Sequence, residues 1–438
     1  MNDAAPRVAA FAETLLGAPL PVRIRAWDGS EAGPPGGPTL VLTHRRALRR
    51  ILWKPGELGL ARAWVSGDLT VEGDLFDLLD RVGGLLWERD PEPGWAAKSA
   101  GPAALLRDAD VRAAVRGLVG LARPWPAPAP PPEEAVRRSG PRRTKASDKQ
   151  AISHHYDVGN EFYERALGPS MVYSCAYWRP GGSLEDAQRD KLDLVCRKLA
   201  LRPGDRLLEV GCGWGSLALH AAREHCAKVT GITLSREQAT YASKRVAEEG
   251  LADLVDIRVQ DYRDVQDGPY DAISSIEMAE HVGAERYRTY AHTLYDLLKP
   301  GGRLLDQQSA RRPWPDEEAY RVDAFIDAYV FPDGELSPVG TTVGELERAG
   351  FEVRDVEALR EHYALTLRAW VARLEEHWEE AVRLTSPGRA RVWLLYMAAT
   401  ALGFEHNRLG VNQVLAVRTG DRSASRMPLR AREWPAQD

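Results

Sequence analysis

The chain has 438 residues, a formal net charge of -5 at pH 7 and a pI of about 6.1. This length exceeds one average domain, so we expect two folding units. The charge excludes a globally basic nucleic-acid-binding protein, and no apolar stretch approaches the ~20 residues that cross a membrane. The N-terminus lacks the basic start and the cleavage site of a secretory signal, which predicts a cytoplasmic protein.

The cysteines and histidines favour reduced thiols and give little support to a metal site. Cys175, Cys196, Cys212 and Cys226 form no C-x-x-C pair and lie in motif or helix-like contexts. The ten histidines form no H-x-x-x-H pair. We therefore expect no disulfide and no bound metal.

Residues 1–122 are predicted to form a small N-terminal domain. Strand-like segments at Val22–Trp27 and Thr39–His44 precede helix-like segments that run through DLFDLLDRVGGLL. The pattern leaves the fold of this unit open, as well as a role in membrane binding or oligomerisation. From Arg123 the run RPWPAPAPPPEE is too rich in proline for a helix or a central strand. We therefore expect a linker at 123–150 and a second domain at 151–438.

Two basic clusters are present, one in the second half of this linker and one in the N-terminal domain. One is RRSGPRRTK at Arg137–Lys145, and the other is HRRALRR, which starts at His44. Either cluster alone fits a solvated surface better than a binding site. The functional alternative is attraction to anionic lipid headgroups, where each basic residue contributes ~1 kcal/mol.

Alternating strand and helix signals after the linker predict a doubly wound α/β fold. The expected strands are Arg206–Val210, Lys228–Leu234, Val255–Gln260, Tyr270–Ile276 and Gly302–Gln308.

The segment EVGCGWGS at 209–216 is a glycine-rich turn between a buried strand and a helix. Such a turn lets the backbone approach a ligand at the carboxyl edge of the sheet. By itself it fits a dinucleotide loop or a plain tight turn as well as a methyltransferase site. A dinucleotide fingerprint needs a glycine at Ser216, and a Walker loop needs Gly-Lys-Ser/Thr. Neither pattern is present.

Polar turns after the next strands favour S-adenosylmethionine, which carries a sulfonium, an amino acid and an adenosine but no phosphate. One turn is Thr233–Leu234–Ser235, and the other is Gln260–Asp261–Tyr262, where an adenine edge would be read. The predicted cofactor-binding residues are Tyr173, Ser174, Glu209, Gly211, Cys212, Gly213, Trp214, Gly215, Thr233, Leu234, Ser235, Gln238, Gln260, Asp261, Tyr262 and Glu277. Aromatic faces stabilise nearby cations by ~0.5–2 kcal/mol, so Tyr177 and Trp178 are further candidates, although both fit an ordinary core equally well.

Longer motifs carry a resemblance to a known family. The chain resembles cyclopropane-fatty-acyl-phospholipid synthases, and their actinobacterial relatives that make methyl-branched fatty acids, in HHYDVGNEFYERALGPSMVYSCAYW, GITLSREQ, QDYRD, IEMAEHVG, KPGGRLL, AYVFPDGELSP and HYALTLRAW. The match spans nearly all of residues 150–420, and YSCAYW and EHVG are far more specific than the glycine turn. LWKPGELGLARAWVSGDLTVEGDLFDLL is similar, more loosely, to the N-terminal domain of such synthases. The resemblance implies a class I, Rossmann-like, S-adenosylmethionine-dependent methyltransferase fold.

The resemblance also implies a reaction on lipid. A cis double bond in an unsaturated phospholipid acyl chain attacks the methyl group of S-adenosylmethionine, and a base then removes a proton from the carbocation. In the family that base is thought to be a bound bicarbonate. Matching motifs place its holders at Cys175, Glu280 and Tyr363, and EHVG adds His281 to the catalytic set. A proton shared between Glu280 and bicarbonate would remove their repulsion, because burial raises carboxyl pKa values.

Each of these residues also has a structural alternative. Cys175 fits a small buried apolar residue. Glu280 and His281 fit a helix cap or a surface pair, and Tyr363 fits a core aromatic with a bonded hydroxyl. The motif context favours function for all four.

The chain departs from the cyclopropane pattern at Leu305–Asp306–Gln307–Gln308, where those synthases have Leu-Leu-His-Thr. Gln307 then takes the place of the bicarbonate-binding histidine. Glutamine can bond an anion but carries no positive charge, so bicarbonate binding is in question and a loosely placed base is expected. We therefore favour a methylene-branched product over a cyclopropane.

The expected partners are an unsaturated phospholipid at the inner membrane surface and a reductase that acts on the product, with a homodimer left open. Two other functions also stay open. One is methylation of a soluble small molecule, and the other is lipid binding without catalysis. Nucleic-acid methylation is disfavoured because no N-P-P-Y-like signature is present.

Overall fold

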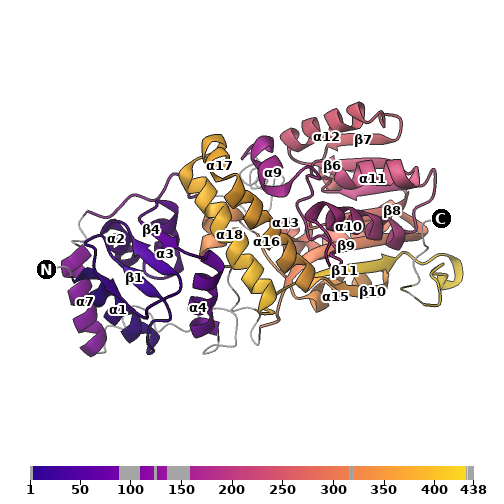
Figure 1. Ribbon diagram of the computed structural model, residues 1–438. Helices are drawn as coiled ribbons and strands as arrows, with labels where there is room; N and C mark the ends of the chain where they lie inside the picture. The colour runs from indigo at the N-terminus through magenta and orange to yellow at the C-terminus, as the bar shows by residue number, and fades with distance from the viewer. Residues whose placement is uncertain are drawn as a thin grey trace. The chain divides into compact units, whose positions relative to one another are not determined.

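The computed structural model describes residues 3–87, 109–122, 126–135, 158–314, 317, 320, 322–332, 334–430 and 432. The chain forms two compact units (Figure 1). The first comprises 1–137, 314–332 and 386–402, and the second comprises 138–313, 333–385 and 403–438. The basic run at 137–145 and most of the proline-rich linker lie outside the described residues.

The first unit contains a four-stranded sheet in the order β2-β1-β3-β4. Its strands are β1 (Arg23–Arg25), β2 (Glu31–Ala32), β3 (Thr39–Leu42) and β4 (Leu69–Glu72). Its N-terminal helices are α1 (Ala4–Leu16), α2 (Arg46–Trp53), α3 (Glu57–Val65), α4 (Leu75–Trp87) and α7 (Ala109–Ala122). The buried side chains of Val8, Ile24, Leu42, Leu48 and Leu118 form a core that joins α1, α2 and α7 to the sheet.

Two later segments belong to this first unit, so the domain predicted at 151–438 is interrupted twice. They contain the π-helical turn Ile326–Val330 and most of α18 (Pro387–Glu405). Trp64 Nε1–H donates to Arg391 O at 2.8 Å. Glu134 accepts from Arg62 at 2.6 Å and from the Tyr329 hydroxyl at 2.9 Å. Such long-range bonds leave no mark in local sequence, which is why the division was not foreseen.

The second unit contains a seven-stranded sheet in the order β10-β11-β9-β8-β5-β6-β7. The strands are β5 (Arg206–Val210), β6 (Lys228–Thr233), β7 (Val255–Val259), β8 (Tyr270–Ile276), β9 (Leu298–Arg311), β10 (Glu352–Ala358) and β11 (Leu409–Val417). β5 to β9 run parallel, whereas β11 pairs antiparallel with both β9 and β10. The strand order reverses at β5, between β6 and β8, which is where ligands bind in such sheets.

The helices of the second unit cover both faces of the sheet. They are α9 (Asn160–Leu167), α10 (Leu184–Leu199), α11 (Ser216–His225), α12 (Arg236–Glu248), α13 (Ala279–Val282), α14 (Ala284–Leu297), α15 (Val339–Arg348), α16 (Arg360–Glu376) and α17 (Trp378–Leu384). Leu207 of β5 packs in one core with α10, α11 and α12, while the next residue, Leu208, packs with α14 and α15. This alternation buries each face of a parallel sheet under its own helices.

The five strands predicted after the linker are all present, and the predicted α/β fold is confirmed. β9 starts four residues earlier and ends three residues later than expected. β10 and β11 were missed, although Leu409–Val417 is almost fully buried. Within the described residues, no helix combines the length and the apolar character needed to cross a membrane.

Candidate active site

The glycine turn joins β5 to α11. Gly211 has a φ of 79°, Gly213 of 51° and Gly215 of 81°. The N–H groups of Gly211 and Cys212 both donate to the end of β6 at 3.0 Å. A Cβ added at Gly211 would lie 2.5 Å from Met278 Cγ. The turn therefore depends on glycine both for its backbone conformation and for the approach of Met278.

A buried acid and a buried amine lie beside this turn. Burial raises the pKa of Glu209 to about 8, against the attraction of Lys191. Burial lowers the pKa of Lys191 to about 8, and its ammonium donates to Ser174 Oγ at 2.9 Å. Glu209 Oε2 is buried and has no hydrogen-bond partner within the described residues. It is therefore a polar atom that a bound hydroxyl or amine would satisfy.

The turn after β6 is closed by its own polar side chains. Thr233 Oγ1 donates to Gln238 Oε1 at 2.8 Å and accepts from Ser235 N at 3.2 Å. Ser235 Oγ in turn accepts from Gln238 N at 3.2 Å and caps α12. These three side chains are buried, and Leu234 between them is partly exposed. The structure thus brings four predicted cofactor residues together in one turn.

The turn after β7 holds the next three predicted cofactor residues. The buried carboxylate of Asp261 accepts from Arg263 Nη2 at 2.6 Å and from Arg263 N at 3.0 Å. Gln260 Nε2 donates to a backbone carbonyl four residues further on. The Tyr262 ring packs edge-on against Tyr290 with 4.8 Å between centroids. Adenine recognition by this turn stays a prediction.

An aromatic cluster connects α9, the glycine turn and α16. The Trp214 ring lies 4.6 Å from Tyr163, and the Tyr173 ring lies 5.4 Å from Trp370. Trp214 Nε1–H donates to Asn160 Oδ1 at 2.8 Å. Trp214 and Trp370 are almost fully buried. The cluster holds these helices beside the glycine turn.

Tyr177 and Trp178 make structural contacts instead of joining that cluster. The Tyr177 ring stacks on His362 with 4.8 Å between centroids, and its hydroxyl donates to Glu357 at 3.3 Å. Trp178 Nε1–H donates to Thr366 Oγ1 at 3.0 Å. Both residues therefore tie the YSCAYW segment to α16 and β10, which supports their structural alternative.

Glu277, predicted to bind the cofactor, lies at the centre of a hydrogen-bond cluster. Its Oε1 accepts from Cys175 N at 2.9 Å and from Gln307 Nε2 at 3.0 Å. Its Oε2 accepts from the Tyr363 hydroxyl at 2.6 Å. Three of the predicted catalytic residues thus converge on one carboxylate at the carboxyl end of β8.

The backbone of Glu277 is strained. Its φ is 54°, a left-handed conformation that glutamate rarely adopts and that costs of order 1–3 kcal/mol. Its N–H donates to Gln307 O at 2.6 Å, which fixes the end of β8 against β9. Strain of this kind persists where the surroundings hold the residue, often at functional sites.

A chain of buried amides continues behind Gln307. Gln307 Oε1 accepts from Gln413 Nε2 at 2.9 Å, and Gln413 Oε1 accepts from Lys198 Nζ at 2.8 Å. Lys198 also pairs with Glu357. This order of donors and acceptors orients the amide of Gln307 so that its N–H faces Glu277.

Glu280 and His281 lie on the short helix α13, just after Glu277. Glu280 Oε1 accepts from Ser309 N at 2.7 Å, and its buried Oε2 has no hydrogen-bond partner among the residues described. Burial and the nearby Glu277 raise the pKa of Glu280 to about 8. Burial lowers the pKa of His281 to about 4. At neutral pH both side chains are therefore uncharged.

The thiol of Cys175 is fully buried. Burial, followed by the charge of Glu277, raises the pKa of this thiol well above its ordinary value. Its Sγ contacts Ala176 O at 3.3 Å. A neutral, buried thiol is a poor nucleophile, so Cys175 contributes its backbone N–H to the cluster and not a thiolate.

Sequence reasoning missed Lys191 and Gln413. Lys191 is a buried lysine on α10, and its only signal in the sequence is a charged residue between the apolar positions of an amphipathic helix. Gln413 lies in the strand β11, which itself was missed, and its neighbours in the sheet place it opposite Gln307. Neither role can be deduced without the sheet order.

The basic cluster that starts at His44 is partly used inside the first unit. Arg46 and Arg50 both pair with the buried carboxylate of Asp68 at 3.0 Å. Arg49 donates to Ala122 O at 2.8 Å. Arg46 keeps 54% of its side chain exposed, so α2 still presents positive charge to solvent.

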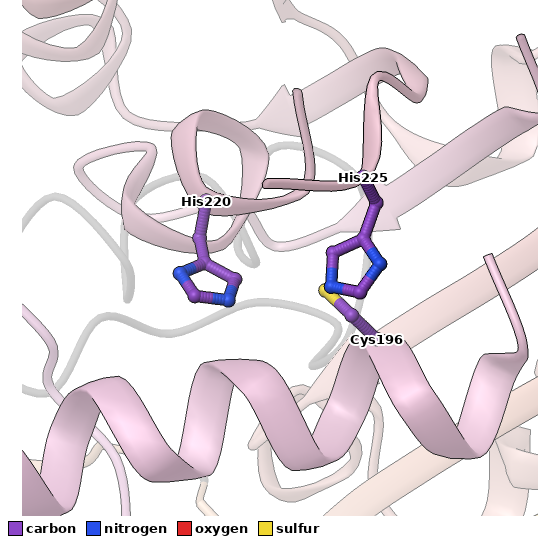
Figure 2. Close-up of side chains that lie close together, drawn as sticks. All are labelled: Cys196, His220 and His225. Atoms are coloured by element: carbon purple, nitrogen blue, oxygen red, sulfur yellow. The ribbon is translucent and has the colours of Figure 1, made fainter. Parts of the chain in front are cut away.

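Cys196 and two histidines come together away from the glycine turn, although no metal site was expected from the sequence. Figure 2 shows Cys196 on α10 facing His220 and His225 of α11. One potential ligand atom from each residue lies within 4.8 Å of the others. The two histidines are five residues apart and the cysteine is on another helix, so a search for H-x-x-x-H could not find them.

The arrangement defines the class of protein. A parallel sheet with an antiparallel strand inserted near one edge, a glycine turn after β5 and polar turns after β6 and β7 form an S-adenosylmethionine-dependent methyltransferase fold. The cofactor, when bound, supplies an electrophilic methyl group. The unsatisfied Glu209 carboxylate and the side-chain-free turn at Gly211 fit such a ligand.

Comparison with known proteins gives the same class, methyltransferases, and a narrower family within it. The family model described as mycolic acid cyclopropane synthetase matches residues 143–414. The chain is 42% identical over 422 residues to a probable fatty acid methyltransferase of Mycobacterium tuberculosis, covering 94% of each chain. It is 40% identical over 404 residues to a probable fatty acid methyltransferase of Pseudomonas putida, covering 91% and 92%. It is 36% identical over 287 residues to the cyclopropane-fatty-acyl-phospholipid synthase of Escherichia coli K12, covering 65% and 72%.

Solved structures of cyclopropane synthases have the same fold as this chain. The cyclopropane synthase MmaA2 of Mycobacterium tuberculosis aligns with a TM-score of 0.58 and 28% identity, covering 64% of this chain and 100% of that one. The mycolic acid cyclopropane synthase CmaA1, complexed with SAH and CTAB, aligns with a TM-score of 0.58 and 32% identity, covering 61% and 98%. The chain belongs to the mycolic acid cyclopropane synthetase family and is an S-adenosylmethionine-dependent methyltransferase.

Proposed function

We propose that the protein transfers a methyl group from S-adenosylmethionine to the cis double bond of an unsaturated fatty acyl chain on a phospholipid. The observation that carries this proposal is the similarity over 94% of the chain to a probable fatty acid methyltransferase, including the N-terminal unit. The E. coli relative is named for a fatty acyl phospholipid, which supports lipid as the substrate. The carboxylate cluster around Glu277 supports a reaction that needs a proton acceptor.

We assign the following roles to the residues of the site. The turn at Gly211 and the polar side chains after β6 and β7 hold the cofactor, and the buried Glu209 bonds one of its polar groups. The π electrons of the double bond form a bond to the methyl carbon as the methyl–sulfur bond breaks. A base then accepts one proton from the resulting carbocation. That base is either a bound bicarbonate, as the family resemblance implies, or a carboxylate of the chain.

We favour a methylene-branched product. Gln307 replaces an ionisable histidine and is held as a neutral donor by Gln413. A proton acceptor positioned by the neutral amide of Gln307, and not by an ionised histidine, need not lie against the new methyl group, which allows a hydride shift before proton loss. A reductase would then convert the methylene to a methyl branch. A cyclopropane is the alternative, and Gln307→His should raise its share if this residue controls the branch.

The substrate implies that the protein works at the membrane surface. The exposed Arg46 of α2 supports attraction to anionic headgroups, with the protein bound peripherally to the inner face. A homodimer is compatible with this placement.

The test is incubation with labelled S-adenosylmethionine and oleoyl phospholipid vesicles, followed by mass spectrometry and proton NMR of the released fatty acids. We expect oleate to gain one CH2, with vinylic methylene resonances. High-field cyclopropane resonances alone would establish the ring product instead. If label enters only soluble small molecules, or if cofactor binds and no lipid is labelled, the proposed substrate is wrong.

A further inference from the structure

We propose that the carboxylate of Glu277 is the base of the reaction and takes the place that bicarbonate was expected to fill. The inference rests on the proposed function, which it deepens by assigning the proton acceptor. It begins from the three donors on Glu277: Cys175 N, Gln307 Nε2 and the Tyr363 hydroxyl.

These donors are the groups that the sequence predicted would hold the anion. Motif matching assigned Cys175 and Tyr363 to bicarbonate, and Gln307 occupies the position of the bicarbonate-binding histidine. Each directs its N–H or O–H at Glu277, at 2.6 to 3.0 Å. A side-chain carboxylate is chemically close to bicarbonate, since both present two oxygens that accept hydrogen bonds and one negative charge. The chain therefore supplies the anion itself.

The backbone supports a functional reason for a glutamate at this position. Glu277 adopts a φ of 54°, where glycine would be unstrained. A glycine here would leave the three donors directed at an open position, which is the arrangement that a free anion needs. Glutamate instead adopts the strained backbone conformation, and its own carboxylate occupies that position.

The groups around Glu277 suit a charged base. Glu280, the nearest carboxyl on α13, is neutral at pH 7 because burial and Glu277 itself raise its pKa to about 8. Burial raises the pKa of Glu277, whereas the Tyr363 hydroxyl and, less strongly, Lys191 favour its ionised form. A carboxylate with a raised pKa binds a proton more tightly than an ordinary glutamate does.

The proton transfer is balanced without any further reactant. After methylation the acyl chain carries a positive charge. Glu277 accepts a proton from the new methyl group, and the C–H electron pair either closes the ring or, after a hydride shift, forms the exocyclic double bond. The proton leaves later to solvent, which restores the carboxylate.

The experiment compares wild type, Glu277→Gln and Glu277→Gly in buffers with and without bicarbonate. Wild-type turnover should not change when bicarbonate is removed. Glu277→Gln should lose activity by about 100-fold or more, the usual range for a general base, while its Kd for S-adenosylmethionine stays within about threefold. Glu277→Gly should be slow, and added bicarbonate or formate should raise its rate at least ~10-fold, because the donors can then hold the free anion.

Several outcomes would overturn the assignment. They are wild-type activity that requires bicarbonate, an active Glu277→Gln, or a loss of cofactor affinity in Glu277→Gln that makes the residue a cofactor ligand. Asp271→Asn, at the opposite end of β8, is the matched control and should behave as wild type. If no lipid is turned over at all, the proposed function fails first. Carbon-13 NMR of labelled bicarbonate tests the role of Glu277 without turnover. Only Glu277→Gly should bind bicarbonate, and binding to the wild type would refute the assignment of Glu277 as the base.

A second, independent observation concerns the residues in Figure 2. We infer that Cys196, His220 and His225 form a structural zinc site. Cys196 and His220 are buried, and Nε2 of both histidines is buried with no hydrogen-bond partner in the part of the chain that the structure describes. Buried polar atoms without partners are rare and need an explanation.

The donor set is the kind that zinc prefers. Zinc binds thiolate and imidazole in tetrahedral geometry, which brings ligand atoms to roughly 3.5 Å of one another. The three atoms here lie within 4.8 Å, so small side-chain rotations would suffice. We expect the fourth ligand of such a site to be water, because the three side chains supply one ligand atom each. The site joins α10 to the end of α11, and its role would be to stabilise this pair of helices.

The zinc site can be tested by metal binding, without any enzyme assay. Metal-stripped protein titrated with zinc should bind one ion per chain and gain thermal stability. Cys196→Ala and His220→Ala should lose that binding, whereas Cys226→Ala, the exposed neighbouring cysteine, should keep it. Cobalt substitution of wild type should give a thiolate charge-transfer band, which covers the case in which variants misfold. Absence of the band, or full zinc binding by Cys196→Ala, would disprove the site.

Discussion

Individual residues at the carboxyl ends of β5 and β8 determine what this site can do. Gly211 keeps the glycine turn free of side chains, and Glu277 accepts three hydrogen bonds. Burial and the nearby Glu277 raise the pKa of Glu280 to about 8. Substitutions at these positions test the proposed cofactor binding and the proposed proton transfer separately.

Gly211→Val should weaken S-adenosylmethionine binding at least tenfold. The valine would need a φ of 79° and a Cβ placed 2.5 Å from Met278 Cγ, so the turn must move. Isothermal titration calorimetry measures the Kd. Gly340→Val is the control, since a Cβ there meets no atom within 4 Å. Unchanged affinity in Gly211→Val would remove the glycine turn from the binding site.

Tyr363→Phe should shift the acidic limb of the pH-rate profile upward by about one pH unit. Burial raises the pKa of Glu277, and the Tyr363 hydroxyl is the first group that lowers it again. Removing this donor raises the pKa further, so more of the base is protonated at a given pH and activity is lost earlier as pH falls. A hydrogen bond to a charged group contributes ~1.5 kcal/mol, which corresponds to about one pH unit. A lower maximal rate with an unchanged apparent pKa of the acidic limb would mean that Tyr363 does not act through Glu277.

At the scale of elements, α16 positions the YSCAYW segment. Thr366 on α16 is fully buried, and its Oγ1 accepts from Ala176 N at 3.1 Å and from Trp178 Nε1 at 3.0 Å. The same helix carries Tyr363, whose hydroxyl reaches Glu277. One helix thus holds the YSCAYW segment and a donor to the carboxylate cluster in fixed register.

Thr366→Val should lower the free energy of unfolding by ~2–4 kcal/mol, because one buried and one partly buried donor lose their acceptor at nearly constant side-chain volume. Chemical denaturation provides the measurement. Thr293→Val is a matched control, since the Thr293 hydroxyl is exposed and bonds only within its own helix. A loss below ~0.5 kcal/mol would show that water replaces Thr366 and that α16 does not hold the segment.

At the scale of the whole molecule, the two units divide the chain in a way that combines distant segments. The first unit gathers 314–332 and 386–402 onto the N-terminal sheet, and it also carries the arginines of α2. The second unit contains the glycine turn and the hydrogen-bond cluster around Glu277.

Activity on anionic vesicles should fall as salt rises, because screening shortens the reach of surface charge to ~8 Å near physiological ionic strength. Turnover of oleoyl phospholipid is measured in vesicles with and without anionic lipid. Zwitterionic vesicles serve as the control and should give a flat response. Salt-independent turnover on both kinds of vesicle would mean that the arginine clusters are ordinary solvated surface and do not attract the membrane.

The sequence by itself determined the fold class, five strands of the second unit and the family, because each depends on local periodicity or on contiguous motifs. The glycine turn after the first of these strands follows from the same kind of short-range pattern. The sequence also grouped Cys175, Gln307 and Tyr363 around one anion.

Only the tertiary structure placed a carboxylate of the chain among these donors. Glu277 was predicted to bind the cofactor, and its hydrogen bonds come from residues 102, 30 and 86 positions away. Gln413 became part of the network only once β11 was paired with β9. The interrupted first unit and the Cys196, His220 and His225 cluster are likewise set by packing between distant segments, for which a single sequence contains no local signal.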